Sequence, residues 1–271
     1  MTSTTLSERP GVDLRKIALP VEHGGWGIVF EPVVLGLIVA PAWPAVLLMF
    51  AAAGVFLTRQ PLRIVLSDRI LRRQRFPRTA AAEGFVLLYG VTAIAALALA
   101  VWFSNSKILV PLAVAAPFAL VQILYDAKNR SRSMLPEIAG AIAMGATAAM
   151  MALAGGLGTG LVALLWILIT ARSVCAIVYV RARLRLEHGQ GRAVFLPMVT
   201  HLAALLFALG LFRLGEGPLL AVVAFGILLG RAIVGLSALR SRIPARQIGW
   251  REIGYGTTSV LLIGLGFALG W

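Results

Sequence analysis

The sequence has little acidic charge and almost no cysteine. Its 271 residues include 11 aspartates and glutamates and one cysteine, Cys175. A single cysteine excludes an internal disulfide and a metal site built from several thiolates. Only 13% of the residues are charged, against about 25% in soluble domains. So few charges cannot cover a surface in water, and a soluble globular protein is therefore excluded.

Apolar residues are abundant instead: they make up 59% of the chain, and the mean hydropathy is +0.90. About 20 consecutive apolar residues are needed for one transmembrane helix. The apolar runs therefore predict an all-α, polytopic membrane helical bundle with about nine transmembrane helices. We expect the spans near residues 24–41, 43–59, 84–104, 107–124, 137–155, 160–180, 194–212, 217–237 and 253–270.

The domain organisation is simple. Residues 1–20 are polar and lack the apolar core of a cleavable signal peptide. We expect them to form a cytoplasmic leader, followed by a single transmembrane domain over residues 21–271. Between the first two spans, Pro41 and Pro44 are expected to break the helix and to force a hairpin.

Basic residues alternate between the connections. Of the 25 lysines and arginines, 21 lie in the leader and in every second connection. The positive-inside rule places these segments in the cytoplasm, with the N-terminus, and places the C-terminus on the outer face. The net charge of +14 is therefore explained by the basic connections that set the orientation in the membrane, and no nucleic-acid partner is expected.

Several ionisable residues fall within the predicted spans, where they are costly unless they are paired or face a cavity. Glu31 and Arg172 are expected at similar depths, and we predict that they pair. Two interpretations remain open: a polar cavity that opens to the cytoplasm, or ion pairs that only hold helices together. The other such residues are Glu83, Glu137, His201 and Arg231.

Three segments at cytoplasmic helix ends concentrate polar and aromatic side chains. They begin at Glu22-His23-Gly24-Gly25-Trp26-Gly27, at Tyr125-Asp126-Ala127-Lys128-Asn129-Arg130 and at Tyr179-Val180-Arg181-Ala182-Arg183. Glu137 follows the second segment in a first helical turn, where an anion complements the helix dipole. The tyrosines are typical of either a site or the aromatic belt at a membrane interface.

These segments resemble the YwiC-like family of bacterial membrane proteins, and the resemblance covers most of the chain. The motifs concerned are Pro20-Val21-Glu22-His23-Gly24-Gly25-Trp26-Gly27, Tyr125 with Lys128-Asn129-Arg130, and Tyr179-Val180-Arg181 with Leu184-Arg185. The resemblance implies a multi-pass protein of the bacterial plasma (inner) membrane. It implies no particular chemistry.

A weaker similarity is to the UbiA superfamily of intramembrane prenyltransferases, whose motifs lie in the same cytoplasmic connections. Asp68 matches the last aspartate of the first Asp-rich motif, but Gln60, Pro61 and Ile64 stand at its other positions. Tyr125 and Lys128 resemble the middle motif. Arginines replace the second Asp-rich motif. The similarity implies a UbiA-like bundle with few aspartates to hold Mg²⁺ against a diphosphate. Mg²⁺ therefore remains as a less favoured alternative, and no other cofactor is indicated.

We therefore expect a cationic pocket that faces the cytoplasm and binds or modifies an amphipathic anionic, isoprenoid, quinone or lipid-like ligand. If it is a divergent transferase, the catalytic candidates are Asp68, Tyr125, Lys128 and Tyr179. The ligand-binding candidates are His23, Trp26, Glu31, Arg59, Arg63, Arg130, Glu137, Arg172 and Arg183. Membrane lipids are the expected partners. A transporter or exporter of a small anion and an assembly factor for a membrane complex remain as alternatives.

Overall fold

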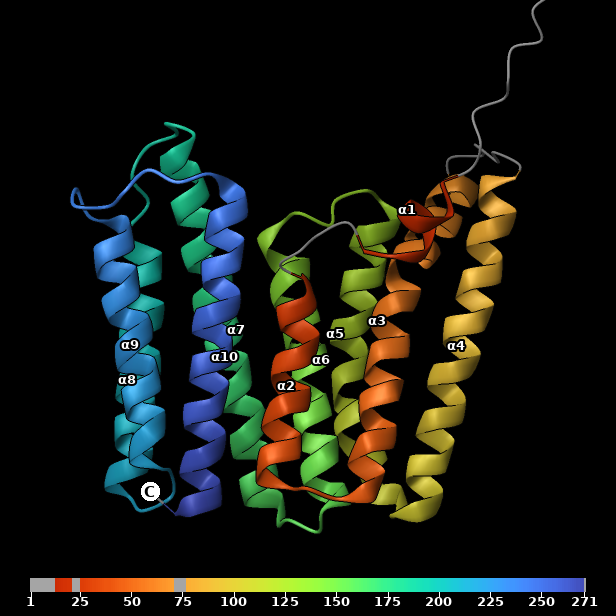
Figure 1. The fold of residues 1–271 in the computed structure, drawn as a ribbon, viewed down its shortest axis with the longest axis horizontal. Helices are drawn as coiled ribbons and strands as arrows, with labels where there is room; N and C mark the ends of the chain where they lie inside the picture. The colour runs from red at the N-terminus through yellow and green to blue at the C-terminus, as the bar shows by residue number, and fades with distance from the viewer. Residues whose placement is uncertain (1–12, 21–24, 71–76, 271) are drawn as a thin grey trace, which may run out of the picture.

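The computed structural model describes residues 13–20, 25–70 and 77–270, and it is all-helical over these ranges. Ten α-helices and one short 3-10 helix follow one another along the chain (Figure 1). They are α1 (Leu14–Ala18), α2 (Gly25–Val39), α3 (Trp43–Ile70), α4 (Arg78–Phe103), η1 (Ser106–Ile108), α5 (Leu109–Ala127), α6 (Met134–Ala154), α7 (Thr159–Glu187), α8 (Phe195–Arg213), α9 (Leu219–Leu236) and α10 (Ala245–Leu269). The predicted all-α membrane bundle is confirmed.

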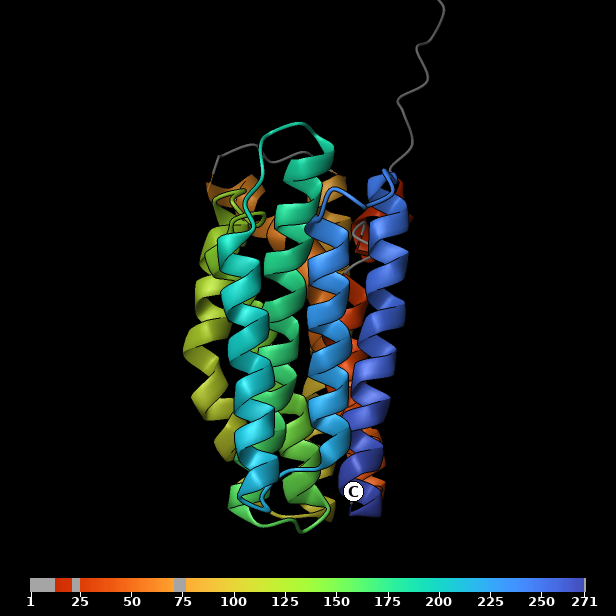
Figure 2. The same ribbon diagram turned by 90° about the vertical axis from the view of Figure 1, so that its left-hand side faces the viewer.

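Helices α2 to α10 run up and down through one bundle, so their connections gather at its two ends (Figures 1 and 2). Eight described helices are long and apolar enough to cross a membrane. Helix α2 has 15 residues, which span only about 22 Å at 1.5 Å per residue. It is therefore shorter than the hydrocarbon core of a bilayer, although it packs among the spanning helices.

One end of the bundle carries most of the basic connections, and we name it the basic end. Helices α3, α5, α7 and α9 end there, and α4, α6, α8 and α10 begin there (Figure 1). Its described connections contain Arg130, Arg132, Arg192, Arg240 and Arg242. The alternation of charge in the sequence thus corresponds to a real asymmetry of the fold.

Helix α6 lies in the interior of the bundle and packs against α2, α3, α5 and α7. Its sequence is rich in alanine and glycine, which allow neighbouring helices to approach closely. Helices α4 and α5 are much more exposed. Helix α4 packs mainly along α3, and α5 packs mainly along α6. The two outer helices are therefore neighbours with almost no contact between them.

Four helices extend well beyond the spans expected from hydropathy, each at the basic end. Helix α3 continues past Arg59 to Ile70, and α7 continues to Glu187. Helix α4 already begins at Arg78, and α10 begins at Ala245. In α3 the extension is stabilised by packing, because Ile64 and Val65 bury apolar surface against Ile17 of α1 and Ala82 of α4. Hydropathy detects only the segment that lies in lipid, so it misses helical turns that pack beyond the membrane.

Candidate functional site

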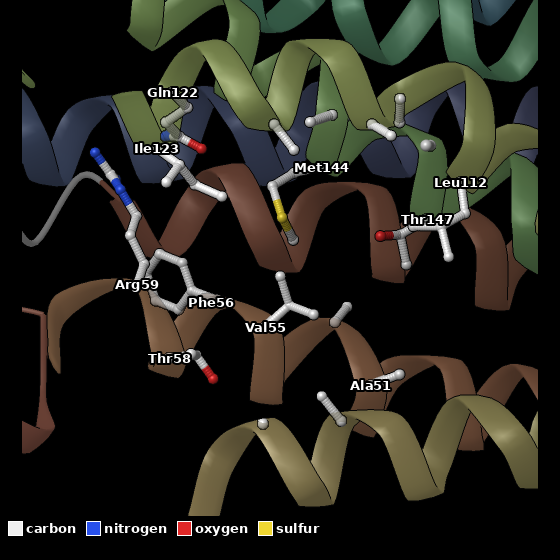
Figure 3. Close-up of a pocket in the computed structure, with 18 of the residues that line it drawn as sticks. Ala51, Val55, Phe56, Thr58, Arg59, Leu112, Gln122, Ile123, Met144 and Thr147 are labelled. Carbon is white, nitrogen blue, oxygen red and sulfur yellow. The ribbon is translucent and has the colours of Figure 1, made fainter. Parts of the chain in front are cut away.

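A cavity of about 390 Å³ lies between α3, α4, α5 and α6 (Figure 3). Its volume is within the roughly 300–1,000 Å³ of small-molecule sites. Most of its wall is aliphatic, with Val55 and Met144 toward the middle of the view. Helix α2 contributes Ile28 to the same wall. We name this space the α3–α6 cavity.

Polar side chains gather at one part of the α3–α6 cavity. Arg59 and Arg63 come from α3, and Gln122 and Asp126 come from α5. Because both helices end at the basic end, these four residues lie toward that end. Figure 3 shows Arg59 and Gln122 on the same side of the cavity, away from Leu112. The cavity is therefore amphipathic, with a polar head and an apolar body.

Arg59 and Asp126 form a two-point ion pair across this polar head. The Arg59 Nε lies 2.7 Å from one carboxylate oxygen of Asp126, and Nη2 lies 3.2 Å from the other. The Asp126 side chain is 5% exposed and the Arg59 side chain is 29% exposed. Such bidentate geometry holds the guanidinium in a fixed orientation. Asp126 was part of the polar segment recognised in the sequence, but its role as the partner of Arg59 depends on tertiary structure.

Arg63 differs from Arg59, although both line the cavity. It is half-buried, and it has no hydrogen-bond or ion-pair partner among residues 13–20, 25–70 and 77–270. One turn separates it from Arg59 on α3, so both side chains lie on one helix face. An arginine with five donors and no anion is a ready partner for a carboxylate or phosphate.

The apolar body of the cavity is elongated along the helices. Its lining residues extend from Leu48 to Phe56 on α3 and from Leu112 to Ala119 on α5, which is about 10–12 Å of helix at 1.5 Å per residue. One leaflet accounts for about 15 Å of the hydrocarbon core, so the apolar body follows most of one leaflet. Thr58, Arg59 and Arg63 continue the lining of α3 toward the basic end.

The α3–α6 cavity opens sideways, where α4 and α5 fail to meet. Ile94 of α4 and Leu112 of α5 line it and are 69% and 40% exposed. Val55 of α3, deeper in the bundle, is still 55% exposed. In a membrane this opening would face the acyl chains of lipids, so an apolar ligand would not have to pass through water.

Trp26 lies behind the cavity wall. Its ring stacks on Phe30 at 5.7 Å and meets Phe56 edge-on at 5.0 Å between ring centroids. Phe56 lines the cavity, so Trp26 supports the wall through it. His23, the other candidate in this segment, lies outside the described residues.

The predicted Glu31–Arg172 pair is confirmed, and it belongs to a second, separate cluster. Both side chains are buried and form an ion pair. Arg172 also donates to the backbone oxygen of Glu252 at 3.3 Å. A Cβ added to Gly256 of α10 would overlap both charged groups. Helices α2, α7 and α10 therefore meet here at a spacing that glycine permits.

Arg231 continues this cluster toward α8 and α9. It pairs with Glu252 at 2.5 Å and lies 2.9 Å from the Nε2 of His201. The Nδ1 of His201 lies 2.7 Å from the backbone oxygen of Pro197, so Nδ1 carries the proton and Nε2 accepts from Arg231. The guanidinium also sits 4.1 Å from the centroid of Tyr179. We name Glu31, Arg172, Tyr179, His201, Arg231 and Glu252 the buried ion-pair cluster.

The buried ion-pair cluster supports the association of five helices. None of its members lines the α3–α6 cavity, and its arginines and glutamates are matched in charge. The pairing of Glu31 with Arg172 is what the helix-association interpretation of the deep charges expects.

Three further candidates are held in contacts between helices. Asp68 accepts a hydrogen bond of 2.9 Å from Thr79 of α4. Glu137 pairs with Arg181 of α7 at 2.8 Å. Arg183 pairs with Glu187 at 2.8 Å and donates to the backbone oxygens of Gly235 and Ser241. These side chains do not line the α3–α6 cavity.

Tyr125, Lys128 and Arg130 lie next to Asp126 at the basic end. Tyr125 is half-buried, whereas Lys128 and Arg130 are exposed. They flank the polar head of the cavity without lining it. Sequence reasoning missed Gln122, although its spacing of four residues from Asp126 would place both on one helix face.

The residues present do not fit a Mg²⁺-diphosphate site. Among the described residues, no three His, Cys, Asp or Glu side chains are grouped as a metal ion would require. Asp68 is bonded to Thr79, and Asp126 is bonded to Arg59. Arginine is the group that this cavity offers to an anion.

The fold is similar to that of a known membrane enzyme. A solved structure of digeranylgeranylglyceryl phosphate synthase, a UbiA-type prenyltransferase, matches with a TM-score of 0.60 at 12% identity. The match covers 89% of this chain and 93% of that chain. No curated protein matches the sequence. The family model of the YwiC-like proteins matches residues 19–154, which are half of the chain, and the protein therefore belongs to the YwiC-like family.

Proposed function

We propose that this protein binds an amphipathic anionic lipid, with its headgroup at Arg63 and Arg59 and its chain in the α3–α6 cavity. The observation that carries the proposal is Arg63, a half-buried arginine without a partner among the described residues, at the polar head of an apolar cavity. A cation in such surroundings is stabilised by an anion that accepts several of its hydrogen bonds.

The length of the cavity supports an extended chain as the apolar part of the ligand. The apolar lining of α3, from Leu48 to Phe56, extends over about 12 Å, which is close to the roughly 15 Å of one leaflet. An isoprenoid, a quinone tail or another long lipid chain fits this shape. The similar structure is that of an enzyme named for a phosphate lipid with geranylgeranyl chains, which supports an isoprenoid.

The proposed orientation follows from charge. The basic end carries Arg59 and Arg63 and most basic connections. By the positive-inside rule, this end faces the cytoplasm of a bacterial inner membrane. A ligand in the cavity would present its headgroup to the cytoplasm, and it would enter from the bilayer between α4 and α5.

Two pairs of variants test the proposal. In the first pair, Arg63→Gln removes the unpaired cation, and Arg246→Gln removes an exposed arginine on α10. In the second pair, Ala116→Trp on α5 fills the cavity from an exposed lining position. Its control, Ala113→Trp, adds the same side chain to an exposed position on α5 that does not line the cavity.

The measurement is mass spectrometry of the lipids that co-purify with each variant in mild detergent. An anionic lipid enriched over the bulk membrane is expected with the native protein and with both controls. Its amount should fall about tenfold or more in Arg63→Gln, which corresponds to about 1.4 kcal/mol, and also in Ala116→Trp. Equal lipid in all five proteins would contradict the proposal.

A further inference from the structure

We infer that Thr147 holds a hydrogen-bonding group in the chain of the ligand, so that the α3–α6 cavity takes an anionic amphiphile with a hydroxyl or carbonyl group in mid-chain. This inference rests on the proposed function, because it concerns the same cavity. It adds a second polar contact, far from the headgroup, and it narrows the ligand from any long lipid chain to an oxygenated one.

Thr147 is a buried polar side chain that points into the cavity. It belongs to α6, lines the cavity and is 8% exposed. Figure 3 shows its hydroxyl oxygen directed into the cavity, on the side of Met144. Among the residues that the structure describes, this hydroxyl has no hydrogen-bond partner. A buried hydroxyl without a partner is unfavourable, so Thr147 indicates a group that a ligand supplies.

Two other threonines on spanning helices satisfy their hydroxyl groups locally. Thr58 of α3 and Thr92 of α4 each donate, at 2.8 Å, to the backbone oxygen one turn earlier in the same helix. Threonine in a helix has a rotamer that allows this bond. Thr147 makes no such bond to Ala143, although both residues lie in the described part of α6. Its hydroxyl is therefore available to the cavity.

The surroundings of Thr147 do not form a site for an ordered water. The nearby lining consists of Met144 and Met150 from α6 and Leu112 and Ala115 from α5, and Figure 3 shows Leu112 beside Thr147. These side chains have no strong donor or acceptor. A buried water needs about two to four polar partners, and one hydroxyl supplies too few. A polar atom carried on an otherwise apolar chain fits these surroundings better.

The depth of Thr147 sets the position of that polar atom along the chain. A Cβ added to Gly140 of α6 would overlap the carboxamide of Gln122, so the polar head and Gly140 lie at one depth. Two helical turns separate Gly140 from Thr147, which is about 10 Å away from the basic end. A ligand with its headgroup at Arg63 therefore reaches Thr147 with the middle of its chain.

The experiment compares two probes, oleate and ricinoleate. They have the same carboxylate and the same chain length, and ricinoleate has one additional hydroxyl group in the middle of its chain. Dissociation constants are measured with the full-length protein in lipid nanodiscs, and empty nanodiscs give the correction for partition into lipid. The proteins are the native chain, Thr147→Val and Thr92→Val.

The two variants remove the same hydroxyl group from different surroundings. Valine has nearly the shape of threonine but cannot hydrogen bond. Thr147→Val removes the hydroxyl that faces the cavity. Thr92→Val is the matched control, because Thr92 is exposed on α4, does not line the cavity and bonds only within its own helix.

The expected result is a change in which acid binds more tightly. The native protein and Thr92→Val should bind ricinoleate about threefold or more tightly than oleate, because Thr147 bonds its hydroxyl. In Thr147→Val that hydroxyl would be buried without a partner, so oleate should bind more tightly. The ratio of the two dissociation constants should therefore move by about tenfold or more.

The outcomes separate this inference from the proposed function. If the native protein binds neither acid, both fail. If it binds both acids but prefers oleate, or if Thr147→Val leaves the ratio unchanged, the mid-chain contact is wrong and lipid binding stands. An equal shift in Thr92→Val would also overturn the inference. If Thr147→Val does not fold, the native ratio decides, since tighter binding of ricinoleate supports the contact and tighter binding of oleate overturns it.

Discussion

The buried ion-pair cluster predicts a large and non-additive loss of stability when one partner is removed. The perturbations are Glu31→Leu and Arg172→Leu, each alone and both together. The side chains of Arg172 and Glu31 are 5% and 7% exposed, so the single change leaves a guanidinium buried without its carboxylate. Breaking a buried pair in this way costs about 3–5 kcal/mol.

The double variant should recover most of that loss. When both charges are replaced by leucine, no unpaired ion remains, and replacing buried pairs by apolar groups is often neutral. The backbone oxygen of Glu252, which accepts from Arg172 at 3.3 Å, would still lose a donor at about 1–3 kcal/mol. We therefore expect the double variant to lose less unfolding free energy than the two single variants together. The difference should be about 2 kcal/mol or more.

Thermal unfolding in one detergent measures the effect. A change of 1 kcal/mol shifts the melting temperature by about 2–4 °C for chains near this size, so Glu31→Leu should lose roughly 6–20 °C. The control is Glu83→Leu, which breaks a 2.6 Å pair with Arg69 whose side chains are 62% and 45% exposed. Exposed pairs contribute about 1 kcal/mol or less. Similar losses for Glu31→Leu and Glu83→Leu would refute the reasoning, as would additive losses in the double variant.

Two further changes test the packing around the charged and polar contacts. Gly256→Ala should lower the free energy of unfolding by about 1–3 kcal/mol, because the added Cβ would overlap Glu31 and Arg172. Its control is Gly254→Ala, which has open space around it and should be neutral or slightly stabilising. Differential scanning fluorimetry compares the two melting temperatures, and equal shifts would contradict the close packing at Gly256. Thr79→Val should cost about 1–3 kcal/mol, because it removes the donor to the buried carboxylate of Asp68. Thr92→Val is its control, since Thr92 is exposed and bonds only within its own helix; a loss as large as that of Thr79→Val would show that the Asp68 contact is not the cause.

Hydropathy and charge predict the general fold of this protein because both are properties of segments. The apolar runs correspond to helices, and the alternation of basic connections corresponds to the two ends of the bundle. The Glu31–Arg172 pair was also predictable, because both residues are costly in lipid and fall at similar depth. The extension of α3 to Ile70 was not, because it depends on packing against α1 and α4.

The site was predictable only at the level of which helix ends carry charge. Arg59, Arg63 and Arg183 look equivalent in the sequence, yet two of them line the α3–α6 cavity and Arg183 holds α7 to the α9–α10 connection. Which arginine has a partner is decided by residues far along the chain, as the pairing of Arg59 with Asp126 shows. Sequence spacing alone contains no information about such partners.

The most direct test of the central claim is an experimental structure of the protein purified in native lipid nanodiscs, with no ligand added. The account predicts elongated density along α3 in the α3–α6 cavity, with its headgroup within hydrogen-bonding distance of Arg63. An α4 packed tightly against α5, with the cavity closed and Arg63 paired to another side chain, would contradict it.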